Sequence, residues 1–163
     1  MSSPIRIWLE ISHHAVFRVG GWAWVRADGV SVSGHAGGDR RSDTERAALS
    51  GLVAAIGQAP GPQPTLLHTS SDLVAAIPRR IKAAQAGEDP PADNLDLWAK
   101  AMTLLATAPV TIVRSPPTPG GPAAFAAAWA EFALGKAKGK GAFTAPIPKS
   151  NLTKLAVETA GTP

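Results

Sequence analysis

Glu10 is the first residue of this chain whose type and position could support chemistry. It lies in the segment IRIWLEIS, residues 5–12, in which apolar residues occupy every second position, as in a strand with one buried face. If this strand is central, Glu10 lies near the end of a sheet, where α/β proteins place their sites. His13 and His14 follow closely enough to supply a ligand, although an exposed pair of loop histidines is more often polar filler.

The elements that would position these residues are three strands followed by alternating helices and strands. Asp28-Gly29 between two alternating runs is a strong hairpin signal and predicts antiparallel strands over 21–26 and 30–35, with Trp22 and Trp24 on one face. Helical spacing, caps and turn residues then predict four helices and two further strands. The helices begin at Ser42 or Asp43, cover 71–87 with a break or kink at Pro78, cover 94–108, and begin at Pro122. The two strands cover 65–70 and 109–115. This order indicates an α/β fold with a mixed five-stranded sheet flanked by helices, antiparallel in its first three strands and parallel in its last two, with the first strand central.

The last predicted helix and the segment after it carry further apolar residues. Phe125, Trp129 and Phe132 recur at i, i+4 and i+7, which predicts a stripe that faces the core. We expect one domain over residues 1–138 and a basic tail over 139–163, extended or partly ordered because it is rich in Gly, Pro and Lys. The apolar residues of the tail suit either a protein partner or a brace over its own domain: Phe143, Ile147, Leu152 and Leu155.

Composition favours a single globular domain without membrane segments. The chain has 163 residues, 45% of them hydrophobic, and no cysteine, so disulfides and thiolate metal sites are excluded. Arg6 interrupts the N-terminal apolar run, and no segment approaches the ~18 apolar residues of a membrane helix, so we expect a cytoplasmic protein. The net charge of +4 lies entirely in residues 134–163, which suits contact with nucleic acid or an acidic partner, or simply a solvated end.

Five short strings occur in a characteristic order along the chain. They are Glu10 followed by Gly20-Gly21-Trp22, SDTERAALSGLVAAI with Glu45, HTSSDLV, NLDLW and VTIVRS. In this order and at nearly this spacing they resemble the type 1 ribonuclease H family, over roughly residues 4–138. The resemblance implies a ribonuclease H-like fold, and an activity that hydrolyses the RNA strand of an RNA/DNA hybrid with divalent metal ions.

The same resemblance indicates a degenerate active site. Two divalent cations about 3.5–4 Å apart can activate the nucleophile and neutralise the leaving oxygen, and several carboxylates must offset their repulsion. Of the four acidic positions that the family uses, Glu10 and Glu45 remain acidic, whereas Ser70 and Ala130 occupy the other two. The loop that carries a histidine in the family reads RSPPTPGG. The resemblance therefore implies that Mg²⁺ or Mn²⁺ binds weakly, if at all, at Glu10 and Glu45, and that catalysis is lost or strongly impaired.

Nucleic-acid binding could outlast catalysis, because the family holds a hybrid by its phosphates, 2′-hydroxyls and groove shape. A solvated charged face is the plain alternative for the candidate residues, which are Arg40, Arg41, Ser42, Arg79, Arg80, Lys82, Lys136, Lys138 and Lys140. We expect a protein that binds RNA/DNA hybrid or duplex. Two alternatives stay open: an active metal-dependent hybrid endoribonuclease with a rearranged site, and a non-catalytic protein-interaction module that acts through the tail.

Overall fold

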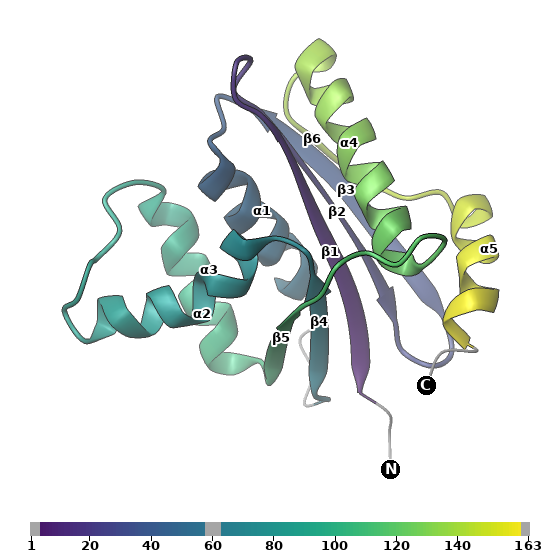
Figure 1. Ribbon diagram of the computed structural model, residues 1–163, viewed down its shortest axis with the longest axis horizontal. Coiled ribbons are helices and arrows are strands. Elements are labelled where there is room, and N and C mark those ends of the chain that lie inside the picture. Colours follow the sequence, from purple (N-terminus) through teal and green to yellow (C-terminus); the bar gives the residue numbers. More distant parts are fainter. Residues whose placement is uncertain (1–3, 58–62, 161–163) are drawn as a thin grey trace.

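A computed structural model describes residues 4–57 and 63–160, and its centre is one mixed sheet (Figure 1). The six strands are β1 (Ile5–His14), β2 (Val19–Ala27), β3 (Val32–Arg40), β4 (Thr65–Thr69), β5 (Val110–Arg114) and β6 (Phe143–Pro146). They are arranged in the order β5-β4-β1-β2-β3-β6. β1 pairs antiparallel with β2 and parallel with β4, and is central as predicted. Residues 1–3, 58–62 and 161–163 of the predicted domain and tail lie outside this description.

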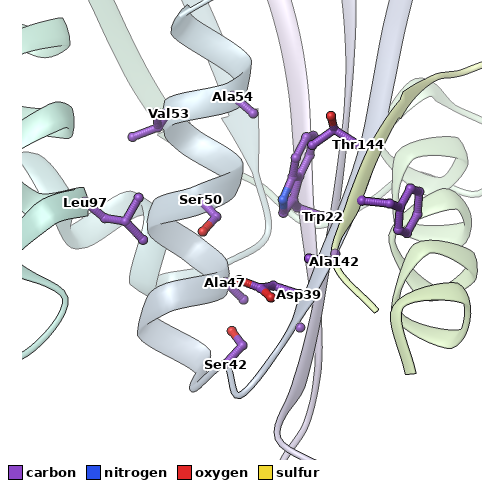
Figure 2. A pocket seen from close by; sticks show the side chains of 13 residues that line it. Trp22, Asp39, Ser42, Ala47, Ser50, Val53, Ala54, Leu97, Ala142 and Thr144 are labelled. Atoms are coloured by element: carbon purple, nitrogen blue, oxygen red, sulfur yellow. The ribbon is translucent and has the colours of Figure 1, made fainter. Parts of the chain in front are cut away.

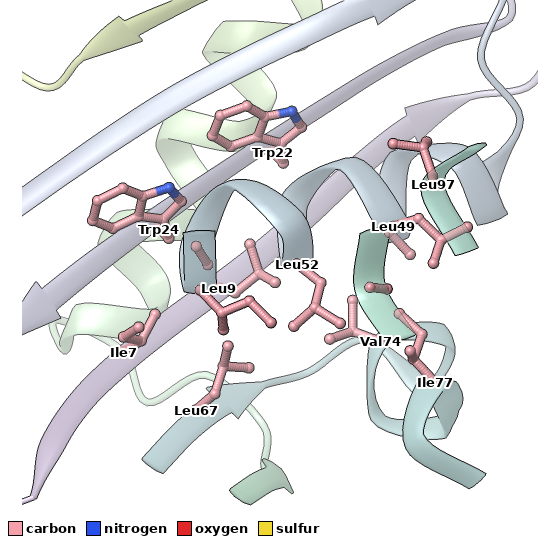
Figure 3. Packing of buried hydrophobic residues seen from close by; sticks show 14 of the residues in the cluster. Ile7, Leu9, Trp22, Trp24, Leu49, Leu52, Leu67, Val74, Ile77 and Leu97 are labelled. Atoms are coloured by element: carbon pink, nitrogen blue, oxygen red, sulfur yellow. The ribbon is translucent and has the colours of Figure 1, made fainter. Parts of the chain in front are cut away.

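Helices cover both faces of the sheet. Three helices cover one face, α1 (Thr44–Gly57), α2 (Asp72–Gln85) and α3 (Leu95–Thr107), while α4 (Pro122–Lys140) and α5 (Lys149–Ala160) lie on the other (Figure 1). Side chains alternate across a strand, so Ile7 and Leu9 of β1 join the core under α1 (Figure 3), whereas Trp8 joins the core under α4. No helix among the described residues is long and apolar enough to cross a membrane.

Two local predictions had different outcomes. The hairpin is confirmed: β2 and β3 pair antiparallel, and the Asp28 Oδ1 accepts hydrogen bonds from the backbone N–H groups of Val30 and Ser31 in the turn. Pro78 was expected to break or kink its helix, and of these two outcomes the break is wrong, because α2 runs through this residue to Gln85. Pro78 is exposed, so its ring does not disturb the packing of the helix on the core.

The stripe predicted on α4 does not face the core as a unit, since Phe132 is 59% exposed. Four fully buried alanines face the sheet instead: Ala126, Ala130, Ala133 and Ala137. The reason is the close approach of the helix to β2 and β3. A Cβ on Gly21 would lie 2.6 Å from the Leu134 nitrogen, and one on Gly38 would lie 3.0 Å from the Ala133 carbonyl oxygen. Only small residues fit on both sides of such a contact.

The segment after residue 138 completes the sheet and one helical layer. The prediction of five strands is wrong, because β6 pairs antiparallel with β3 through the register His35–Pro146 to Gly38–Phe143. Beyond β6, three apolar side chains are buried against the sheet and α4: Ile147, Leu152 and Leu155. The described part of the tail therefore forms the intramolecular brace that the sequence left as an alternative.

Candidate functional site

Glu10 is buried at the centre of the sheet, next to the end of β4. It is only 3% exposed. Its Oε2 accepts a hydrogen bond from the Ser70 backbone nitrogen at 2.9 Å, and its Oε1 accepts one from the Ser70 hydroxyl. Parallel pairing of β1 with β4 brings these residues together although they are 60 positions apart. Burial raises the pKa of the Glu10 carboxyl group, and the two hydrogen bonds from Ser70 oppose this rise. Ser70 thus binds both oxygens that a metal ion would need.

An aromatic and basic row lies beside Glu10 on the same face of the sheet. Trp8 stacks on His68 with ring centroids 5.7 Å apart, and the guanidinium group of Arg6 lies 4.8 Å from the centre of a Trp8 ring. Burial, and secondarily the charge of Arg6, lower the pKa of His68. The sequence placed Trp8 on the face of Glu10, and the stacked row extends this face from β1 to β4.

The buried state of Glu10 predicts an unusual dependence of stability on pH. A carboxyl group whose folded-state pKa lies above its ordinary value of 4.5 destabilises the folded state increasingly as pH rises from that value through the folded-state pKa. Glu10→Gln should therefore raise the free energy of unfolding at pH 7.5 by on the order of 1 kcal/mol, or about 3 °C in Tm. Near pH 4 the difference should largely vanish. Thermal melts followed by circular dichroism at both pH values measure it.

The exposed Glu131→Gln variant is the control for this measurement. It removes the same charge without a buried carboxyl group, so its Tm should follow the wild type at both pH values. A Glu10→Gln variant that is less stable than wild type at pH 7.5 would contradict the burial argument.

Glu45 has a different set of partners. It lies in the first turn of α1 and accepts hydrogen bonds from the Arg80 guanidinium group of α2 and, at 3.0 Å, from the Asn94 side chain. Burial works against the charged form, but the hydrogen bonds from Arg80 and Asn94 outweigh it, so the pKa of Glu45 is lowered. Arg80 also lies 4.5 Å above a ring of Trp98. The ion pair of Glu45 with Arg80 and the hydrogen bond from Asn94 thus link α1, α2 and the start of α3.

The four positions predicted from the resemblance do not form one cluster of metal ligands. Glu10 is bound by Ser70, Glu45 is bound by Arg80 and Asn94, and Ala130 is fully buried where α4 passes over Gly21. Among the described residues, no group of three or more His, Cys, Asp or Glu side chains could hold a metal ion. The residues present thus do not fit the metal site that the resemblance implies.

His13, which the sequence offered as a possible ligand, and two further carboxylates, Asp72 beside Ser70 and Glu131 beside Ala130, have other surroundings. His13 hydrogen-bonds through Nε2 with the Ser42 carbonyl oxygen at 2.8 Å, and through Nδ1 with the Thr44 hydroxyl at 3.1 Å. It thereby joins the end of β1 to the start of α1. Asp72 forms an exposed ion pair with Arg114, and Glu131 is exposed on α4. Among the described residues, the side-chain hydrogen bonds of Glu10 come from Ser70 and from none of these three.

The residues predicted to bind nucleic acid divide between two surfaces and two contacts within the protein, with Lys136 apart from both. Arg79 and Lys82 are exposed on α2. Arg80 is held by Glu45, and Ser42 is 1% exposed with its hydroxyl donating to the Asp43 carbonyl oxygen. Ser42 and Arg80 therefore make contacts within the protein, and their role in nucleic-acid binding stays a prediction. The other surface lies at the end of α4.

We call this second group the α4-end surface, and it includes residues of the turn between β1 and β2 that the sequence analysis missed. Its members are Phe17, Arg18, Arg40, Arg41, Lys138 and Lys140, all exposed. The Arg40 guanidinium group donates to the carbonyl oxygens of Ala137 and Lys138 at 3.1 and 2.9 Å, and the Lys138 ammonium group lies 3.6 Å from the centre of the Phe17 ring.

The exposed turn explains why Phe17 belongs to this surface. Val16 and Phe17 are 82% and 52% exposed, and Phe17 packs against His14 with ring centroids 4.8 Å apart. Two apolar residues in a polar link between strands were the sequence signal for it. Lys136 lies apart from the surface, with its ammonium group 4.7 Å from the Phe143 ring of β6.

Comparison with solved structures decides the fold. The N-terminal RNase H domain of rv2228c from Mycobacterium tuberculosis, solved as a fusion with maltose binding protein, matches with a TM-score of 0.65 and 19% identity over 83% of this chain and 96% of that one. The chain has the ribonuclease H-like fold. LC9-RNase H1, described as a type 1 RNase H with the type 2 active-site motif, matches this ribonuclease H-like chain with a TM-score of 0.66 and 16% identity, over 100% of this chain and 87% of that one.

A third ribonuclease H structure extends the comparison to a complex. LC11-RNase H1, solved with an RNA/DNA hybrid, matches with a TM-score of 0.61 and 15% identity over 82% of this chain and 98% of that one. No protein-family model matches this sequence. No curated protein matches it either. The ribonuclease H-like fold predicted from the five strings is confirmed by structure alone.

Proposed function

We propose that this chain is a ribonuclease H-like protein that binds RNA/DNA hybrid and has lost hydrolysis or keeps it only in strongly impaired form. The observation that carries the proposal is the hydrogen bonding of both Glu10 oxygens by Ser70. Hydrolysis by two metal ions requires several carboxylates converging on one point. Here one carboxylate is buried against a serine, and the other is neutralised by Arg80.

Binding needs only the fold and a basic surface. A similar ribonuclease H, LC11-RNase H1, was solved in complex with an RNA/DNA hybrid. Contacts with phosphates depend on Lys and Arg rather than on metal ligands. The α4-end surface offers exposed cations around an exposed aromatic ring, and Arg79 and Lys82 of α2 offer two more.

One finding favours the active alternative, a metal-dependent hybrid endoribonuclease with a rearranged site. LC9-RNase H1 is described as a type 1 RNase H with the type 2 active-site motif, so the active-site motif can differ between proteins of similar structure. Glu10 would then have to leave Ser70 to bind a metal ion. A cleavage assay with a Glu10→Gln control separates a binding protein from an active nuclease.

The test is incubation of the purified protein with end-labelled RNA/DNA hybrid in Mg²⁺ and in Mn²⁺, with binding measured in parallel by fluorescence anisotropy. Glu10→Gln and Glu45→Gln control for contaminating nuclease, and duplex DNA serves as competitor. We expect binding that weakens with salt and no cleavage. Cleavage by the wild type that Glu10→Gln abolishes would establish the active alternative. Absence of binding to either nucleic acid would overturn the proposal.

A further inference from the structure

The aromatic stripe of α4 lies beside the contact of this helix with the sheet and not within it. Phe125, Trp129 and Phe132 recur at i, i+4 and i+7, whereas the buried alanines of the helix face β2 and β3. Phe125 and Trp129 are half-buried at the margin of the core under α4, and Phe132 is 59% exposed. Exposed apolar residues that form one patch, unlike scattered single ones, mark an interaction surface.

The three rings form a continuous ridge along α4. The ring centroids of Phe125 and Trp129 lie 6.3 Å apart, and those of Trp129 and Phe132 lie 5.3 Å apart. With a rise of about 1.5 Å per residue, the ridge is about 10 Å long. The rings are inclined to each other by 47° and 75°, so they do not present the parallel faces on which successive bases of a single strand would stack. The ridge therefore suits protein side chains better than a row of bases.

Phe143 of β6 extends this ridge toward the edge of the sheet. Figure 2 shows Thr144 beside Trp22, on the face of the sheet that α1 covers. Because side chains alternate along a strand, Phe143 faces the opposite side, where the Lys136 ammonium group of α4 lies 4.7 Å from the centre of its ring. We call four aromatic residues the α4 aromatic surface: Phe125, Trp129, Phe132 and Phe143.

A cavity between α4 and α5 continues the α4 aromatic surface at its N-terminal end. α5 lies beside the first turns of α4 (Figure 1), and a cavity of about 360 Å³ opens between the two helices. Phe125 lines it from α4, and Leu155 and Lys154 line it from α5. Leu155 is 3% exposed and gives the cavity an apolar floor. The cavity therefore offers room for a large apolar side chain of a partner next to the Phe125 ring.

The charge around the α4 aromatic surface is positive. Lys136 lies at one end of the ridge, four residues after Phe132, and Lys154 lines the cavity at the other end. Residues 134–163, which include the end of α4, β6 and α5, carry five lysines and one glutamate. This field favours an acidic partner and disfavours a second copy of this chain, which would bring the same lysines to the contact.

The α4 aromatic surface and the α4-end surface lie on opposite flanks of α4. Lys138 lies over Phe17 of the turn between β1 and β2, whereas Lys136 lies over Phe143 of β6. In the sheet order, β2 and β3 separate β1 from β6. A molecule bound at the aromatic rings therefore does not occupy the surface that we propose for the hybrid.

We propose that the α4 aromatic surface binds an acidic, amphipathic helix of a partner protein. Apolar residues three to four positions apart on that helix pack along the ridge, as in other helix-in-groove contacts, and one of them enters the cavity above Leu155. Carboxylates on either side of this apolar stretch pair with Lys136 and Lys154. Aromatic anchors such as Trp129 and Phe132 supply most of the binding energy at interfaces of this kind. The interaction is independent of the hybrid-binding function proposed above.

A designed peptide tests this surface directly. Its sequence carries leucines at i, i+4 and i+7, glutamates on both sides of them, and alanine and glutamine elsewhere. Binding of the fluorescein-labelled peptide is followed by fluorescence anisotropy, and we expect a Kd on the order of 50 μM at low salt. A peptide with lysine at every glutamate position should bind at least about tenfold more weakly. Equal binding of the two peptides would overturn the proposal.

Variants locate the peptide on α4. Phe132→Ser changes an exposed side chain, so it should melt like the wild type, and it should weaken the peptide about tenfold or more. Phe17→Ser removes another exposed phenylalanine, 52% exposed and outside this surface, and should leave the Kd unchanged. The double variant Lys136→Gln, Lys154→Gln should weaken the peptide about three- to tenfold and reduce its salt dependence. Binding to Phe132→Ser as tight as to wild type would contradict the proposal.

A single strand of oligo(dT) tests the other class of anionic partner. Because the rings of the α4 aromatic surface are not arranged for stacking, oligo(dT) should not displace the peptide from the wild type. Hybrid binding by Phe132→Ser should likewise match the wild type. Displacement of the peptide by oligo(dT) would assign the surface to nucleic acid and overturn the proposal.

Discussion

Gly21→Ala should destabilise this protein more than any other single methyl group added to the sheet, by about 3 kcal/mol or more. The added Cβ would lie 2.6 Å from the Leu134 backbone nitrogen and against the Ala130 carbonyl oxygen. Both atoms belong to the backbone of α4, so the clash cannot be relieved by a side-chain rotation. The whole helix would have to move away from β2 and from the core that it covers.

Gly135→Ala is the matched control, since it adds the same methyl group to α4 itself. Beyond the adjacent backbone of α4 itself, no described atom lies within 4 Å of the added Cβ, and alanine favours a helix over glycine by up to about 1 kcal/mol. Urea unfolding followed by circular dichroism should therefore show a higher midpoint for Gly135→Ala and a much lower midpoint, or no folded protein, for Gly21→Ala. A loss below about 1 kcal/mol for Gly21→Ala would mean that α4 is not seated on β2 this closely.

The same contact explains why the sequence misled on the orientation of α4. Its aromatic residues and its alanines both recur at helical spacing, so the periodicity allows either stripe to face the sheet. Aromatic burial is normally the stronger driving force. Here Gly21 and Gly38 leave no depth for a large side chain, and this information lies on other strands more than 80 residues away. The alternation in β1 carried no such ambiguity, and the central place of this strand was predicted correctly.

The tail shows a second limit of reading local sequence. β6 has four residues, ends in Pro146 and carries no alternation long enough to predict a strand. It exists because β3 offers an unpaired edge, and because Ile147 and Leu152 are then buried beside it. Its role depends on a partner strand that precedes it by about a hundred residues, which a local pattern cannot reveal.

The sequence was a better guide to which residues lie in the candidate site than to the hydrogen bonds that these residues form. Alternation in β1 was enough to place Glu10 on the face of Trp8. The bonds from Ser70 to Glu10 and from Arg80 to Glu45 join residues 60 and 35 positions apart. They follow from the parallel pairing of β1 with β4 and from the packing of α2 on α1. A local sequence pattern can indicate such elements, but it does not predict which side chains hydrogen-bond between them. For this reason the sequence offered Arg80 as a candidate for nucleic-acid binding without indicating its ion pair with Glu45.

Removal of three cations from the α4-end surface should weaken hybrid binding by about 10- to 100-fold at low salt. The variant is Arg41→Gln, Lys138→Gln and Lys140→Gln, all of which change exposed side chains. Each lost phosphate contact should also reduce the slope of log Kd against log salt concentration by about 0.9 or less. Fluorescence anisotropy with a labelled RNA/DNA hybrid at several salt concentrations measures both quantities.

The comparison variant removes the same total charge elsewhere, at Lys100, Lys149 and Lys154, which are also exposed. If binding depended only on the net charge of the protein, both triple variants would weaken it equally. We expect the comparison variant to stay within about threefold of wild type, because long-range attraction is screened beyond about 10 Å at 0.1 M salt. Equal losses would assign binding to the overall field of the protein. Loss confined to Arg41, Lys138 and Lys140 would place the nucleic acid at the end of α4, beside the exposed ring of Phe17.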